Sequence, residues 1–195
     1  YKSDTKRVFL TFDDGPSPVT SKILDILKQE NVKATFFILG SNVDSRKDVV
    51  KRMYEEGHYL ANHGYSHTYS KIYSSPQSVL DEYNECNDKV KNAIEVPDYN
   101  SHLFRFPGGL AGGKYAEIKK EAKELLLQNN IVNVDWNALT GDAETNNLSV
   151  EFEMTRLTET MESKNSLVIL MHDAAAKSVT ADALPQIIAK LKEEG

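Results

Sequence analysis

Residues 7–16 read Arg7-Val8-Phe9-Leu10-Thr11-Phe12-Asp13-Asp14-Gly15-Pro16, a β-rich run that ends in a cluster of turn-forming residues. The β-branched and aromatic content up to Phe12 predicts a strand, and the residues after it predict a turn. The next segment, residues 18–30, spaces Ile23, Ile26 and Leu27 as on one face of a helix. The chain therefore begins with a strand followed directly by a helix.

The same alternation continues to the end of the chain. Further strands are predicted at residues 32–39, 58–62, 103–106, 131–136 and 167–171, and further helices at residues 44–56, 76–94, 114–128, 149–162 and 180–193. About six βα units follow one another without a linker, a low-complexity segment or a repeat. This pattern predicts an α/β fold with a parallel sheet, either open or closed into a barrel, in a single domain over residues 1–195.

Composition and charge exclude several classes of protein. The chain has 195 residues, with 23 Lys and Arg against 29 Asp and Glu, and a formal net charge of −6. Because no basic cluster appears, a nucleic-acid partner is not expected. The longest clean apolar run, Leu167–Met171, is far shorter than the roughly 20 residues that span a bilayer, so we expect no membrane insertion within this chain. Cys86 is the only cysteine, which excludes an intrachain disulfide and predicts an inert, half-buried thiol.

Ionisable and polar residues gather where the predicted strands end. In parallel α/β folds, ligands bind beyond the carboxyl ends of the strands. Candidate residues follow or end five of the predicted strands: Asp13 and Asp14, then His63 and His67, then Arg105, then Trp136 with Asp142 in its loop, and finally His172. This placement predicts a single site at one edge of the sheet.

Two of these groups suggest a metal site. His63 and His67 are four residues apart, so on one helical turn their imidazoles would share a face. Because neighbouring residues at a strand end point to different sides, one of Asp13 and Asp14 can bind a metal while the other stays free as a base. Two His and one carboxylate suit catalytic zinc, and also iron or cobalt. The alternatives are a structural His pair and an Asp that caps the helix beginning near Pro18.

Four short motifs in order resemble those of a known family. They are Thr11-Phe12-Asp13-Asp14-Gly15, His63-Gly64-Tyr65-Ser66-His67, Arg105-Phe106-Pro107-Gly108-Gly109 and Leu170-Met171-His172-Asp173. The set resembles the NodB-type polysaccharide deacetylases, carbohydrate esterase family 4, from about residue 7 to the last helix. The resemblance implies a deformed (β/α) barrel of six to seven βα units. It also implies metal-dependent removal of acetyl groups from N- or O-acetylated sugars, with Zn²⁺, Co²⁺ or another divalent transition metal.

The resemblance implies roles for the first half of the site. Asp13 would be the catalytic base, and Arg105 would hold it in place. Asp14, His63 and His67 would bind the metal. A carboxylate beside a guanidinium stays ionised and oriented, as a base must be.

The resemblance also implies roles for the second half. His172 would be the general acid, and Asp142 would orient it. The backbone N–H of Gly108 would help to stabilise the oxyanion, and Leu170 would shape the pocket for the acetyl methyl group. Trp136, at a strand end, is expected to form part of the pocket wall and to contact substrate.

The sequence departs from the family pattern at three positions. Leu139 and Ala143 stand where the family has Asp and Trp, and losing the aromatic ring is expected to open one side of the groove and to weaken stacking on a sugar. Gly64 replaces the usual Ser or Thr between the two histidines, which removes a hydroxyl that would brace the loop.

These observations predict a metal-dependent hydrolase that removes acetyl groups from N-acetylated sugars of an extracellular polysaccharide, foremost the N-acetylglucosamine of cell-wall peptidoglycan. The first alternative is an O-acetyl esterase acting on acetylxylan with the same residues. The second is a carbohydrate-binding protein without turnover. The expected partner is the acetylated polysaccharide, and such a substrate implies a secreted or surface-tethered domain.

Overall fold

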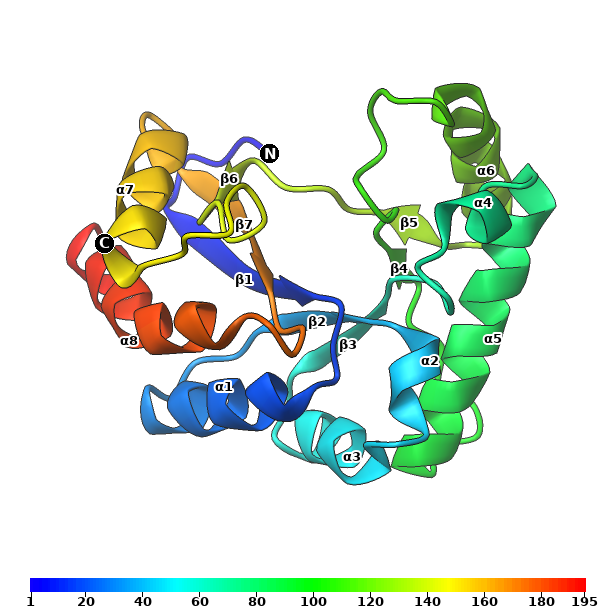
Figure 1. Ribbon diagram of the computed structural model, residues 1–195, viewed down its shortest axis with the longest axis horizontal. Helices are drawn as coiled ribbons and strands as arrows, with labels where there is room; N and C mark the ends of the chain where they lie inside the picture. The colour runs from blue at the N-terminus through cyan, green and yellow to red at the C-terminus, as the bar shows by residue number, and fades with distance from the viewer.

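The computed structural model describes residues 1–195 and contains seven strands: β1 (Arg7–Asp13), β2 (Thr35–Ile38), β3 (Tyr59–Asn62), β4 (Leu103–Phe104), β5 (Val132–Asn133), β6 (Ala138–Leu139) and β7 (Ser166–His172). All neighbouring strands pair in parallel, in the order β5-β4-β3-β2-β1-β7-β6. The sheet curls into a barrel that stays open between β5 and β6 (Figure 1). The predicted deformed (β/α) barrel is confirmed.

Eight helices complete the fold: α1 (Pro18–Gln29), α2 (Gly40–Val43), α3 (Lys47–Glu55), α4 (Tyr69–Ile72), α5 (Pro76–Ile94), α6 (Ala116–Gln128), α7 (Val150–Met161) and α8 (Ser178–Glu193). Figure 1 shows α1, α7 and α8 beside β1 and β7, with α5 and α6 together at the other side of the curled sheet. Three helices begin at a serine whose side chain accepts a backbone N–H, namely Ser17, Ser75 and Ser149. Such caps satisfy donors that have no partner within the helix, which is why these starts are readable in the sequence.

The predicted strand over residues 131–136 is wrong in extent. Only Val132 and Asn133, as β5, pair with β4, and a separate short strand, β6, pairs with β7 on the other side of the opening. Between them the backbone N–H of Val134 donates to the carbonyl of Phe104 on β4, and that of Asn137 donates to the carbonyl of Val168 on β7. A side chain binds the carbonyls of this stretch. Arg105 donates from Nε to the carbonyl of Val134 at 2.9 Å and from Nη2 to that of Asp135 at 3.2 Å. These bonds satisfy backbone groups that would otherwise need a ladder partner.

Two apolar clusters hold the fold together. The larger contains 28 buried residues, from Leu10 and Phe12 of β1 to Ile187 and Ile188 of α8. The smaller contains nine, including Phe104 and residues of α5 and α6. The Cys86 side chain is fully buried rather than half-buried, and burial raises the pKa of its thiol, in keeping with the inert role predicted for it.

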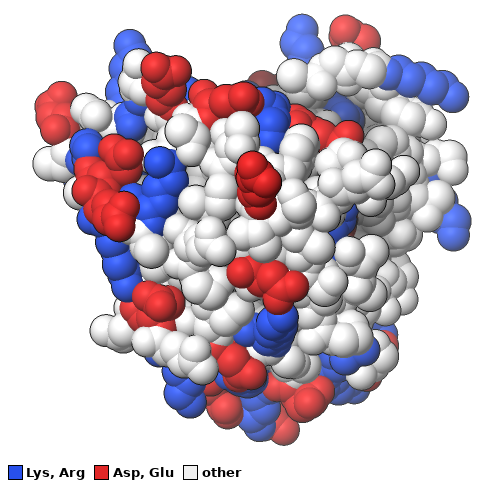
Figure 2. All heavy atoms as spheres, turned by 60° about the vertical axis from the view of Figure 1, so that its left-hand side comes forward, with Lys and Arg blue, Asp and Glu red and all other residues white.

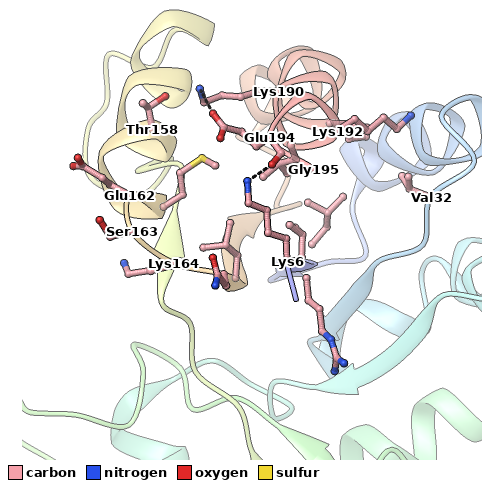
Figure 3. A pocket seen from close by; sticks show the side chains of 18 of the residues that line it. Lys6, Val32, Thr158, Glu162, Ser163, Lys164, Lys190, Lys192, Glu194 and Gly195 are labelled. Carbon is pink, nitrogen blue, oxygen red and sulfur yellow. Dashed lines mark hydrogen bonds and ion pairs between the residues drawn. The ribbon is translucent and has the colours of Figure 1, made fainter. Parts of the chain in front are cut away.

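A cavity of about 1060 Å³ lies at the amino ends of β1 and β7 (Figure 3). Lys6 reaches across it to donate to the backbone carbonyl of Glu194. Because β1 runs from this cavity to Asp13, the cavity is at the opposite end of the sheet from the candidate site. Acidic and basic side chains are interleaved on the side that carries α7 and α8 (Figure 2). None of the eight helices has the length and apolar character needed to cross a membrane.

Candidate active site

The carboxyl ends of the strands bring the predicted site residues together. Asp13 ends β1 and His172 ends β7, and the two are paired residues of adjacent strands. Asp14 follows directly, and His63 and Arg105 come immediately after β3 and β4. The predicted meeting of these residues at one edge follows from the parallel pairing of the strands.

Arg105 fixes the carboxylate of Asp13. Its guanidinium is fully buried and donates from Nη1 to Asp13 Oδ1 and to Thr11 Oγ1, both at 2.8 Å. The guanidinium also lies 3.9 Å from the centre of the Phe37 ring. With bonds in several directions, Arg105 holds one rotamer and therefore orients Asp13.

The pKa of Asp13 is raised, although Arg105 by itself would lower it. Complete burial raises the pKa of Asp13 above its ordinary value, while Arg105 and His172 oppose that rise without cancelling it. Burial prevails because the charged form loses its hydration. A carboxylate with a raised pKa accepts a proton more readily, which suits a general base.

Asp14, His63 and His67 form a group that could hold a metal ion. One ligand atom from each residue lies within 4.8 Å of the others. Asp14 Oδ1 is 3.5 Å from His63 Nε2 and 3.4 Å from His67 Nε2. Asp14 Oδ1 is also buried without a hydrogen-bond partner. A buried, unpartnered carboxylate oxygen facing two imidazole nitrogens fits the ligand set of a two-His, one-carboxylate metal site.

The state of His63 supports this fit. Its Nδ1 lies 2.7 Å from the backbone carbonyl of Arg105, which can only accept, so Nδ1 carries the proton and Nε2 has a free lone pair. Burial lowers the pKa of His63 to about 3, so the imidazole is neutral. A ligating histidine commonly donates its other N–H to a carbonyl in this way.

His63 and His67 do not share a helical turn. Both lie in the loop after β3, where His67 has φ of 52° and Gly64 has φ of 82°. Loop curvature therefore replaces helical spacing in bringing the two rings near each other, with centroids 5.5 Å apart.

Glu82 of α5 braces this loop and was not singled out from the sequence. Its carboxylate accepts the backbone N–H groups of Tyr65 and Ser66, both at 2.9 Å, and also the Ser66 hydroxyl. A Cβ atom added at Gly64 would lie 2.8 Å from Ile72 Cδ1 and 3.1 Å from Glu82 Oε2. The brace expected from a hydroxyl at position 64 is thus supplied by Glu82, and glycine leaves room for it. No local sequence signal marks Glu82, because its partners are 16 and 17 residues away.

We expect Glu82→Ala to weaken metal binding by about 10–100-fold, the usual cost of removing a group that orients metal ligands. The loss of the carboxylate frees the loop that carries His67. Competition with a chromophoric chelator measures the affinity. Glu85→Ala, an exposed position on the same helix, is the matched control. Equal affinities for the two variants would contradict a bracing role for Glu82.

His172 and Asp142 form a second hydrogen-bonded pair. His172 Nδ1 lies 2.8 Å from Asp142 Oδ1, and the backbone N–H of His172 donates to Asp142 Oδ2 at 2.7 Å. Burial by itself lowers the pKa of His172, but the hydrogen bond and charge of Asp142, with the carboxylates of Asp13 and Asp14, raise it to about 9. The imidazole is therefore protonated at neutral pH, with Nε2 left to donate.

The predicted pocket residues lie around the same edge. The backbone N–H of Gly108 makes no hydrogen bond within the protein, so it is free to donate. A Cβ atom added at Gly108 would lie 2.5 Å from the Tyr69 hydroxyl, so a side chain there would displace that ring. Half-buried Trp136 lies 5.6 Å from the Arg105 guanidinium, measured to its ring centre. Leu170 is buried next to Leu139, its partner on β6.

Ala143 is exposed in the loop that follows Asp142, so no aromatic side chain stands at that position. Leu139 is part of β6, and its backbone N–H donates to Thr160 Oγ1 at 3.0 Å. The leucine at this position therefore belongs to the barrel wall.

Comparison with known proteins identifies the family. A family model described as "Polysaccharide deacetylase" matches residues 1–128, which include Asp13, His63 and Arg105. The chain belongs to the polysaccharide deacetylase family. The resemblance read from the four motifs is confirmed. Asp142 and His172 lie beyond the matched residues, within the part that the relatives below also cover.

This member of the polysaccharide deacetylase family resembles proteins from several bacteria. YheN of Bacillus subtilis, named as a polysaccharide deacetylase, is 38% identical over 97% of this chain and 65% of its own length. A peptidoglycan-N-acetylglucosamine deacetylase of Bacillus cereus is 33% identical over 98% of this chain and 68% of its own length. The structure of a CE4 esterase of Streptococcus mutans superposes with a TM-score of 0.90 at 36% identity, covering 98% of this chain and 84% of that one. The chain thus spans about two thirds of the two Bacillus relatives.

Proposed function

We propose that this protein hydrolyses the N-acetyl group of N-acetylglucosamine in peptidoglycan. The observation that carries the proposal is the meeting of three units at one sheet edge. They are an Arg-held carboxylate (Asp13), a group fit for a metal (Asp14, His63, His67) and a protonated His–Asp pair (His172, Asp142). A carbohydrate-binding protein would need neither the base nor the acid.

Each residue has a definite task in this proposal. Asp14, His63 and His67 would hold Zn²⁺, or Co²⁺ in its place, which when bound polarises the acetyl carbonyl and lowers the pKa of a water molecule. Asp13, held by Arg105, accepts a proton from the attacking water.

The remaining residues stabilise the negative charge on the acetyl oxygen, protonate the leaving amine and contact the substrate. The free N–H of Gly108 donates to the acetyl oxygen as it gains negative charge. His172 then gives its Nε2 proton to the departing amine, which cannot leave easily as an anion. The apolar side chain of Leu170 faces the acetyl methyl group, and Trp136 contacts the sugar.

The substrate class rests on the named relatives. The Bacillus cereus relative bears the name of a peptidoglycan-N-acetylglucosamine deacetylase, which supports peptidoglycan as the polysaccharide. With such a substrate, the domain would act outside the cell or at its surface.

A second candidate function is O-acetyl ester hydrolysis on acetylxylan. A bifunctional xylanase/deacetylase of Pseudobutyrivibrio xylanivorans is 33% identical over 97% of this chain, which is 29% of its own length. The same base and carbonyl-polarising group would serve an ester, and the exposed Ala143 leaves that side of the site open.

Acetate release tests the proposal directly. The substrates are peptidoglycan, N-acetylglucosamine oligomers and acetylated xylan, each assayed before chelation, after chelation and after zinc is restored. We expect release from the first two that is lost on chelation and regained with zinc. Release from xylan alone would favour the esterase, and tight zinc binding without any release would favour a binding protein.

A further inference from the structure

A second carboxyl group lies buried behind Asp142. Glu153 of α7 is fully buried, although glutamate is seldom buried without a charged partner. No Lys, Arg or His contacts it. Its Oε1 lies 3.2 Å from the hydroxyl of Thr180 on α8, and its Oε2 is buried with no hydrogen-bond partner.

Thr180 joins this carboxyl to Asp142. Its Oγ1 lies 3.1 Å from Asp142 Oδ2 and 3.2 Å from Glu153 Oε1. A hydroxyl has one proton, so it can donate to only one of two carboxyl oxygens. The other contact is a hydrogen bond only if that carboxyl group itself carries a proton. Both contacts can be full hydrogen bonds only with one of the two acids neutral.

The surroundings decide which acid holds the proton. Asp142 accepts two bonds from His172, from the backbone N–H and from Nδ1, and its backbone carbonyl accepts Lys177 Nζ. Glu153 meets only hydroxyl groups. Burial, and then the charge of Asp142, raise the pKa of Glu153 to about 7, with Lys177 the one cation that opposes the rise. Below that pKa, the negative charge therefore belongs on Asp142.

We propose that Glu153 is a neutral positioning residue that acts through Thr180 on the Asp142–His172 pair. Its carboxyl O–H donates to Thr180 Oγ1, and the Thr180 hydroxyl proton is thereby directed to Asp142 Oδ2. Asp142 is then held by three donors and keeps the only negative charge of the cluster. The catalytic part of this inference rests on the proposed function, whereas the protonation state of Glu153 does not.

Substitution of Glu153 separates a neutral role from a charged one. Glu153→Leu removes the donor to Thr180, and at pH 6 we expect kcat to fall by up to about tenfold at unchanged KM, the size of one hydrogen bond between neutral groups. Glu153→Gln supplies an amide N–H in the same place. It is expected to keep kcat within about twofold of the wild type, because glutamine, like a protonated glutamate, is uncharged and can donate to Thr180. Glu151→Leu, an exposed site on the same helix, is the control. A Gln variant as impaired as the Leu variant would overturn the proposal.

Substitution of Thr180 tests the link itself. Thr180→Val keeps the shape of the side chain without the hydroxyl and is expected to lower kcat by about tenfold, whereas Thr180→Ser keeps the bridge and the rate. Thermal unfolding of each variant shows whether it is folded. A folded valine variant with the wild-type kcat would overturn the proposed link.

Carbon-13 NMR of the Glu153 side-chain carboxyl needs no turnover and so remains informative if the proposed function fails. The spectrum of the zinc-loaded wild type is recorded at pH 6, below the raised pKa of about 7, and Glu153→Gln assigns the signal. We expect the chemical shift of a protonated carboxyl group, whereas exposed glutamates, with an ordinary pKa of about 4.3, are ionised at this pH. The chemical shift of an ionised carboxylate would refute the neutral state whatever the substrate proves to be.

Discussion

Replacing Asp13 by asparagine is expected to lower kcat for acetate release by about 10²–10⁴-fold, the usual cost of removing a group that transfers a proton. Asparagine keeps the shape of the side chain and can still accept a bond from Arg105, but it cannot take a proton from water. Initial rates on N-acetylglucosamine oligomers at saturating zinc measure the loss.

Asp13→Asn removes the base and leaves the three metal-binding residues in place. Because Asp14 rather than Asp13 faces both His63 and His67, the variant is expected to bind zinc with nearly the wild-type affinity. Asp4→Asn, at an exposed position, is the control substitution. Full activity in Asp13→Asn would show that another group accepts the proton.

The sequence could predict those parts of the fold that local chemistry determines. The apolar strands β1 and β7 and the serine-capped helices depend on residues close to one another along the chain. The candidate site could also be predicted, since parallel strands bring their carboxyl ends to one edge and Asp13 and His172 end adjacent strands.

Features that depend on distant contacts could not be read in this way. The interruption between β5 and β6 follows from bonds donated by Arg105, about 30 residues earlier in the chain. The loop geometry of His63 and His67 depends on left-handed backbone at Gly64 and on the carboxylate of Glu82. Buried acids such as Glu153 look like ordinary surface positions of a helix until the opposing helix is in place.

The direction in which the pKa of Asp13 shifts also depends on distant contacts. The sequence motifs predict that the neighbouring guanidinium dominates this pKa. Complete burial reverses the net direction, because the desolvation of a charged group depends on everything packed around it and not on one partner. The ion pair between Arg105 and Asp13 can be predicted from the motifs, whereas the complete burial of Asp13 can be predicted only when the folded structure is known.

Replacing His172 by alanine is expected to distinguish amide from ester hydrolysis. On an N-acetylated sugar the leaving amine must be protonated as it departs, so kcat is expected to fall by about 10²–10⁴-fold. On an acetyl ester the departing alkoxide is a much better leaving group, and the loss is expected to be smaller. Parallel rates on N-acetylglucosamine oligomers and acetylated xylan measure the difference, with His102→Ala, at an exposed histidine, as control.

The pH profile supplies an independent check of the same assignment. An acid acts in its protonated form, which for His172 persists up to its raised pKa of about 9 and is lost above it. The decline in wild-type amide hydrolysis that His172 causes should therefore lie on the alkaline side, near that value. Asp142→Asn removes the charge that raises this pKa, so the decline should move to lower pH. An alkaline limb that stays in place in Asp142→Asn would assign it to another group and remove His172 from the role of acid.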